Sequence, residues 1–194
     1  MSTEGKLQMY GSLFCPGLQS VGLLLAISVI SLTTVWAGEP SGVGKISDDE
    51  VVDRITRALP SAAPVVPGKQ RRLLIFDLNV GYGGHPSAAH ANRAFELMGK
   101  RTKAFNVVLS RDPAVFKPES IRQFDAVFFN NTVGNLFANP VLRESLVRFV
   151  YRGGGLMGVH GASVAFTRWP GAIEDWPEFG LMIGARGANH RESD

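Results

Sequence analysis

The residue with the most specific chemical context is His160, which ends a glycine-rich apolar segment. Residues 153–161 read GGGLMGVHG, which predicts a short strand that leads into a tight turn between Gly158 and Gly161. In open α/β sheets, ligands bind beyond the carboxyl ends of the strands, and a glycine-flanked turn there projects a side chain outward. An imidazole at this elbow predicts proton transfer, metal ligation or hydrogen bonding to a polyol. The elbow holds no thiol or hydroxyl, so covalent acyl transfer is not expected.

Two further histidines are candidates to share this site. His85 lies in a glycine-rich loop, and His190 lies in the segment GANHR near the end of the chain. Together with His160 they would meet the three-ligand count of a catalytic zinc site, although such wide spacing along the chain is weak support for a metal. A solvated loop position is the alternative for both, and His90 is predicted to be a surface residue of a helix.

Polar side chains also follow the other predicted strands. Asn131 and Thr132 come after one apolar run, as Asp77 and Asn79 do after an earlier one. Such groups can reach a ligand at the strand ends, and they can equally cap the next helix.

Two tryptophans lie just past the elbow. Trp169 and Trp176 flank a segment that includes Glu174 and Asp175. Indole faces beside carboxylates suit a sugar, because a sugar offers an apolar face with hydroxyls at its edge. The alternative is that both indoles cover the end of the sheet.

The scaffold for these residues consists of strands and helices that alternate along the chain. Apolar runs predict strands at residues 72–77, 105–109, 124–129 and in the segment before His160. Helical periodicity and capping signals predict one helix over residues 87–100 and another that begins after Asn139 and ends at Gly153. This alternation predicts an α/β fold with a doubly wound, mostly parallel sheet of flavodoxin-like type.

Composition indicates one globular domain and argues against nucleic-acid binding. The 194-residue chain is 45% hydrophobic and 19% charged, and its 20 basic and 17 acidic residues are scattered without runs. Basic and aromatic residues do not interleave on any predicted face, so no nucleic-acid partner is expected.

Segment 1–37 predicts an export signal. No charged residue occurs between Lys6 and Glu39, and the apolar run ends in a small-residue cleavage pattern. Cleavage would leave Gly38 at the new N-terminus and remove Cys15, the only cysteine, so the mature chain would have neither a disulfide nor a catalytic thiol. The alternative is an uncleaved membrane anchor, and only in that case is a membrane partner expected.

Residues 38–70 predict a lead-in to the main domain. Ser47 precedes three acidic residues and an amphipathic run, which predicts a short capped helix, and three prolines then predict a stiff connector. This segment would pack on the edge of the domain, and a disordered linker is the alternative.

Three motifs together resemble the trehalose-utilisation (ThuA-like) family. They are Gly81-Tyr82 with His85 and Ser87, residues 131–134 (NTVG), and the triple glycine that leads to Gly158-Val159-His160. The resemblance covers residues 71–194 and implies the class I glutamine amidotransferase-like fold, with histidine in place of the cysteine of those enzymes. Glutaminase activity is therefore not expected. The resemblance also implies that further strands and helices follow the elbow, so we expect the domain at residues 71–194 to be incomplete.

Two functional hypotheses result, and the sequence does not decide whether the chain is an enzyme. In the first, an exported protein acts on or binds a carbohydrate of the trehalose type, with His160 as acid, base or metal ligand. Its predicted substrate-binding residues are His85, Asn131, Thr132, Trp169 and His190. In the second, a non-catalytic interaction module keeps the scaffold without a nucleophile. The candidate cofactor is a divalent metal held by His85, His160 and His190, and no oligomeric state is predicted.

Overall fold

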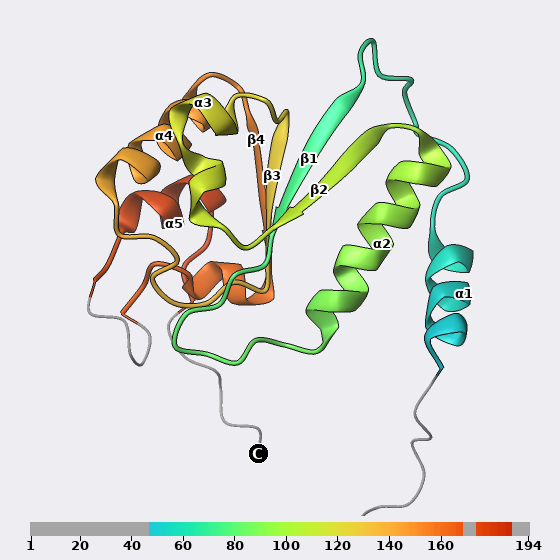
Figure 1. The fold of residues 1–194 in the computed structure, drawn as a ribbon, viewed down its shortest axis with the longest axis horizontal. Coiled ribbons are helices and arrows are strands. Elements are labelled where there is room, and N and C mark those ends of the chain that lie inside the picture. Colours follow the sequence, from blue (N-terminus) through green and yellow to red (C-terminus); the bar gives the residue numbers. More distant parts are fainter. Residues whose placement is uncertain (1–46, 169–173, 188–194) are drawn as a thin grey trace, which may run out of the picture. The chain divides into compact units, whose positions relative to one another are not determined.

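The computed structural model describes residues 47–168 and 174–187, which form a parallel sheet between two layers of helices (Figure 1). The strands are β1 (Arg71–Phe76), β2 (Phe105–Ser110), β3 (Ala126–Asn130) and β4 (Gly155–Val159). Their order is β2-β1-β3-β4, and every neighbouring pair is parallel. The predicted doubly wound, flavodoxin-like α/β fold is thus confirmed.

Strand β1 is the centre of the core because it is apolar on both faces. Leu74, Ile75 and Phe76 have no exposed surface. Side chains that alternate along a strand face opposite sides, so Ile75 belongs to one core cluster while Leu74 and Phe76 belong to the other. A continuous apolar run is therefore what a strand covered on both faces requires.

Helices cover the two faces unequally. Helix α2 (Ser87–Thr102) covers the face of Ile75 and Phe128, and α3 (Pro118–Ile121), α4 (Pro140–Tyr151) and α5 (Pro177–Ile183) lie on the other side (Figure 1). The 3₁₀ helices η1 (Pro113–Phe116) and η2 (His160–Val164) complete the described elements after β2 and β4.

The predicted elements differ from the observed ones mainly at their ends. Strand β3 begins at Ala126, two residues later than predicted, because the Phe124 amide donates to the Ile121 carbonyl and closes a turn. Helix α2 runs on to Thr102 and ends where Lys103 adopts the left-handed conformation. Helix α4 begins as predicted, with the Asn139 side chain accepting a hydrogen bond from the Val141 amide.

The predicted lead-in helix is α1 (Asp48–Ala58), which Ser47 caps through a hydrogen bond from the Glu50 amide. A guanidinium nitrogen of Arg101 on α2 donates to the Thr56 carbonyl at 2.6 Å. This hydrogen bond joins α1 to α2, and the packing of residues 38–70 as a whole on the domain stays a prediction.

The loops after β1, β3 and β4 are bonded to one another at the carboxyl edge of the sheet. The Val80 amide donates to the Val133 carbonyl, and the Phe166 amide donates to the Gly134 carbonyl, both at 2.9 Å. Gly134 has a φ of +91°, and a Cβ at this position would overlap the Val80 carbonyl oxygen. Only glycine permits this crossing of two loops, which brings the residues after all three strands together.

Strand β4 is the edge of the described sheet next to β3. Met157 and Val159 lie on the face that α2 covers elsewhere, yet they are 42% and 41% exposed.

No helix among the described residues is long and apolar enough to cross a membrane.

Candidate functional site

His160 is held in a strained conformation at the end of β4. It is the first residue of η2, its φ is +49°, and its side chain is exposed. The left-handed conformation costs a residue with a Cβ about 1 to 2 kcal/mol, and such strain is typical of functional sites. The predicted elbow is present, but the strain lies at the histidine itself and not at its glycines.

The two glycines of the elbow permit close packing instead. A Cβ on Gly161 would lie 2.9 Å from a Val133 methyl and 3.1 Å from the Asn131 carbonyl, and a Cβ on Gly158 would lie 2.7 Å from that of Ala162. These contacts seat the turn after β4 against the loop after β3. The elbow therefore has no room for larger residues on either side of His160.

The loop after β1 brings a second imidazole to the elbow. The ring centroids of His85 and His160 are 4.4 Å apart, with an angle of 76° between the ring planes. The Tyr82 hydroxyl lies 3.2 Å from Nε2 of His85. Gly81 and Gly84 have φ values of +72° and +80°, which bend the loop so that His85 meets His160.

Asn131 holds His160 from the loop after β3. Its Oδ1 lies 3.0 Å from Nδ1 of His160, and its own φ is +54°. Asparagine is one of the few residues with a Cβ that adopts this conformation readily. The structure thus brings three of the predicted site residues together, His160, His85 and Asn131, from three different loops.

Three asparagine side chains, the amide relay, continue inward from His160. Asn131 Nδ2 donates to Asn130 Oδ1 at 2.8 Å, and Asn130 Nδ2 donates to Asn92 Oδ1 at 2.8 Å. Asn92 Nδ2 in turn donates to a carboxylate oxygen of Asp77 at 2.9 Å. Asn130 and Asn131 are 0% and 5% exposed, so these bonds satisfy amides that would otherwise be costly to bury.

The amide relay ends on an ion pair. Asp77 is 7% exposed and accepts hydrogen bonds from Nε and Nη2 of Arg111 at 2.8 and 3.0 Å. Burial alone would raise the pKa of Asp77, but the hydrogen bonds from Arg111 and Asn92 outweigh burial, and the pKa of this carboxyl is lowered. Asp77 therefore stays ionised at neutral pH.

The direction of the hydrogen bonds assigns the tautomer of His160. Every amide of the relay donates toward Asp77, so Asn131 presents its carbonyl oxygen to His160. Nδ1 of His160 is then the donor, and Nε2 carries the lone pair when the ring is neutral. That lone pair can accept a hydroxyl proton, hydrogen bond to a ligand or ligate a metal.

The remaining predicted site residues are not in this cluster. Thr132 is 0% exposed, so it lies beneath the site, and its hydroxyl has no hydrogen-bond partner among the described residues. Trp169 and His190 lie outside the described residues. His90 is exposed on α2, as predicted.

Trp176 belongs to the core. It is 8% exposed, and its ring meets that of Phe166 edge-on at 5.0 Å. The acids beside it are paired, because Glu174 accepts from Arg143 at 2.6 Å and Asp175 accepts from Arg186 at 2.7 Å. For Trp176 the structure therefore favours the interpretation that the indole covers the end of the sheet.

The described residues do not complete a metal site by themselves. They contain no group of three or more histidine, cysteine, aspartate or glutamate side chains that could hold an ion. His85 and His160 supply two imidazoles, and a catalytic zinc site needs three protein ligands. The proposed third ligand, His190, lies outside the described residues.

A family model described as trehalose utilisation (ThuA) matches residues 72–194. The chain belongs to the ThuA family. The match includes His85, Asn131 and His160 as well as the amide relay and the Asp77–Arg111 pair.

One solved structure is also similar to this ThuA-family chain. It is a crystal structure of a protein from Bacteroides uniformis, described as ThuA-like, with 17% sequence identity and a TM-score of 0.44. The likeness covers 61% of this chain and 46% of that one, so the chain spans less than half the length of this relative. A search of curated proteins found no match.

Several residues of this ThuA-family site were missed by sequence reasoning. Asn130 follows four apolar residues of the same strand, and Asn92 lies one helical turn after buried Ala88. In both cases a polar residue stands at a position that the apolar pattern of its element assigns to the buried side, and this pattern was the signal that could have found both. Arg111 offered no such signal, because its partner Asp77 is 34 residues away in the sequence.

Proposed function

We propose that this ThuA-family chain binds a carbohydrate at the carboxyl ends of β1, β3 and β4, with His160 as the central polar group. The observation that carries the proposal is the conformation of His160: its φ of +49°, its bond to Asn131 and its contact with His85. A strained, exposed histidine that two other loops hold in place is typical of a ligand-binding position.

The chemistry of the cluster suits hydroxyl groups. The imidazole of His160 is exposed, and the Tyr82 hydroxyl beside His85 can donate or accept a hydrogen bond. A polyol needs both kinds of partner within a few ångströms. We include Trp169 and His190 in this proposal as further contacts to the ligand, and we leave out Thr132 because it is buried.

Among residues 47–168 and 174–187, an amide holds Nδ1 of His160. In catalytic triads a carboxylate at this position stabilises the imidazolium that forms during proton transfer. An amide orients the ring but supplies no full negative charge. This difference favours binding over strong general acid–base catalysis, and it also supports the second hypothesis, a non-catalytic interaction module that keeps the scaffold without a nucleophile.

Titration calorimetry with trehalose and a panel of other disaccharides tests the proposal. We expect His160→Ala to abolish the heat of binding that the wild-type chain gives with at least one disaccharide. His90→Ala is the matched control, since it removes an exposed imidazole of α2 outside the cluster. Binding that survives His160→Ala would overturn the assignment. A wild-type chain that binds none of the sugars would favour an interaction module with another partner.

A zinc titration of the wild type and of His85→Ala, His160→Ala and His190→Ala tests the metal hypothesis. If His85, His160 and His190 form a metal site, each single alanine variant is expected to lose most of its zinc affinity. Equal affinity in the wild type and His160→Ala would remove the metal from the proposal.

We also propose that the chain is exported and that segment 1–37 is removed. The support is the uncharged apolar run of the segment and its small-residue ending. Mass determination of the protein recovered outside the cytoplasm is expected to give an N-terminus at Gly38. A full-length chain in the membrane fraction would instead support the uncleaved anchor.

A further inference from the structure

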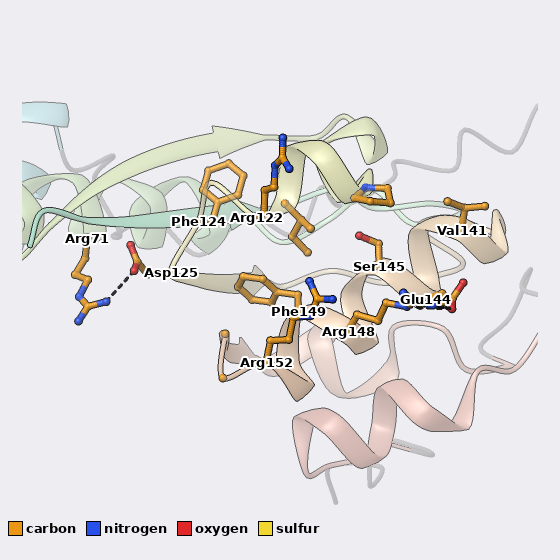
Figure 2. A pocket seen from close by; sticks show the side chains of 14 residues that line it. Arg71, Arg122, Phe124, Asp125, Val141, Glu144, Ser145, Arg148, Phe149 and Arg152 are labelled. Carbon is orange, nitrogen blue, oxygen red and sulfur yellow. Dashed lines mark hydrogen bonds and ion pairs between the residues drawn. The ribbon is translucent and has the colours of Figure 1, made fainter.

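A second cavity lies at the opposite end of the sheet from His160. It has a volume of about 540 Å³, and its walls come from α3, α4 and the segments that precede β3 and β4 (Figure 2). Arg71 begins β1, and Gly154 directly precedes β4, so the cavity lies at the amino ends of the strands. It shares no residue with the cluster around His160, and its volume is in the range typical of small-molecule sites.

Apolar and aromatic side chains form part of the lining of this cavity. Phe124 and Phe149 line it from two walls, and Ile121 adds an aliphatic surface (Figure 2). Gly154 has a structural reason to be glycine here, because a Cβ would overlap the Phe149 ring. Phe124 is 6% exposed, so the half-buried Phe149 supplies most of the aromatic surface that a ligand could contact.

The charges around the cavity are unequal. Four arginines and two carboxylates line it: Arg71, Arg122, Arg148, Arg152, Asp125 and Glu144. Both carboxylates are paired: Asp125 with Lys69 and Arg71 at 2.9 and 2.8 Å, and Glu144 with Arg148. Hydrogen bonds from Lys69 and Arg71 hold the pKa of Asp125 well below its usual range, so the carboxylate stays ionised and its charge is compensated by these two side chains.

Two guanidinium groups are left for a ligand. Neither the Arg122 nor the Arg152 side chain makes an ion pair or hydrogen bond with the described residues, and both are exposed. Guanidinium groups bind carboxylate, sulfonate and phosphate oxygens in a planar, two-pronged geometry and also stack on flat rings. A cavity with some apolar lining and two such groups is complementary to a molecule that is apolar at one end and anionic at the other.

We propose that this cavity binds an amphipathic organic anion, whose apolar body lies against Phe149 and whose charged group is attracted by Arg122 and Arg152. The site is independent of the carbohydrate site, because the two lie at opposite ends of the strands. A ligand here would contact both α3 and α4 and would bridge these two helices at the amino ends of the strands.

A pair of fluorescent probes separates the two parts of this proposal. 8-Anilinonaphthalene-1-sulfonate carries the charge, and N-phenyl-1-naphthylamine has the same rings without it. Titrated into the full chain, the sulfonate is expected to bind more tightly than the neutral amine. In the double variant Arg122→Ala/Arg152→Ala the sulfonate affinity should fall about tenfold, because two charge-assisted hydrogen bonds are lost. The affinity for the neutral amine should not change.

Two further variants complete the test. Arg54→Ala/Arg57→Ala removes the same charge from α1 and should leave both affinities unchanged. Val141→Trp, at a position that lines the cavity and is 53% exposed, should reduce the binding of both probes by filling the space. Sulfonate affinity that is the same in the wild type and in Arg122→Ala/Arg152→Ala, or equal affinity of the wild type for the two probes, would overturn the proposal.

Discussion

At the scale of single residues, the site depends on two residues with a Cβ that occupy the left-handed region, His160 and Asn131. Because the φ of His160 is positive, glycine should fit its backbone better than alanine. We expect His160→Gly to be about 1 kcal/mol more stable than His160→Ala, because glycine adopts a positive φ without steric cost. Urea unfolding of both variants measures the difference. Equal stability would mean that the backbone relaxes when the imidazole is removed.

Asn131 is expected to select the tautomer of His160. In the wild type, neutral His160 should carry its proton on Nδ1, because Asn131 presents an oxygen to that nitrogen. Asn131→Gly keeps the positive φ but deletes the acceptor, so the proton should move largely to Nε2. Nitrogen-15 chemical shifts of the imidazole report the tautomer directly. Asn106→Ala, an exposed position of β2, is the control that should leave those shifts in place.

At the scale of the elements, Gly134 and Gly153 form a matched pair, because both have a φ of +91°. A Cβ at Gly153 meets nothing within 4 Å, whereas one at Gly134 overlaps the Val80 carbonyl. We expect Gly153→Ala to cost about 1 kcal/mol of backbone strain and Gly134→Ala to cost about 3 kcal/mol or more, since the loops after β1 and β3 must then separate. Chemical unfolding measures both. Similar values for the two variants would show that the loop crossing does not hold the carboxyl edge together.

The stability that the Asp77–Arg111 ion pair contributes between the end of β1 and the loop after β2 is expected to depend on pH. Asp77 has a lowered pKa in the folded chain, so its stabilising effect is complete above the unfolded value of about 3.9 and is lost as the pH falls through the lower folded value. Arg111→Met should reduce stability at neutral pH by about 1 kcal/mol, a small effect because Arg111 is 72% exposed. The difference should vanish at low pH, where Asp77 is protonated in both proteins.

Thermal unfolding of the wild type and Arg111→Met between pH 2 and pH 7 measures this dependence. Arg57→Met is the comparison, because it breaks an exposed ion pair on α1 and should cost less than about 0.5 kcal/mol. A deficit in Arg111→Met that persists at low pH would assign the effect to packing and not to charge.

At the scale of the whole molecule, the edge strand β4 exposes apolar surface beside the α2 layer. Met157 and Val159 are half-exposed, and among the described strands β4 pairs with β3 alone. Exposed apolar edge strands promote association between chains. We expect Met157→Lys/Val159→Lys to slow heat-induced aggregation, as light scattering would measure. Tyr151→Lys/Leu181→Lys adds the same charge at exposed positions of α4 and α5 and should have less effect.

Much of the fold was predictable from local patterns in the sequence. The apolar run of β1, the Asn139-Pro140 start of α4 and the Ser47 cap of α1 each specify their element through neighbours in the chain. Element ends were less predictable, as at β3, because a hydrogen bond between Phe124 and Ile121 competes with the strand. The expectation that the domain at residues 71–194 is incomplete stays a prediction.

The site was predictable only in part, for a physical reason. Residue types and glycine spacing were enough to single out His160, and strand alternation was enough to place it at a carboxyl edge with His85 and Asn131 nearby. The amide relay, the ion pair of Asp77 with Arg111 and the unpaired arginines of the second cavity join residues that lie tens of positions apart in the chain. Local sequence determines which elements form and which groups they carry. The tertiary structure alone decides which of those groups meet, because long-range hydrogen bonds and burial depend on how the elements pack and leave no periodic signal in the sequence.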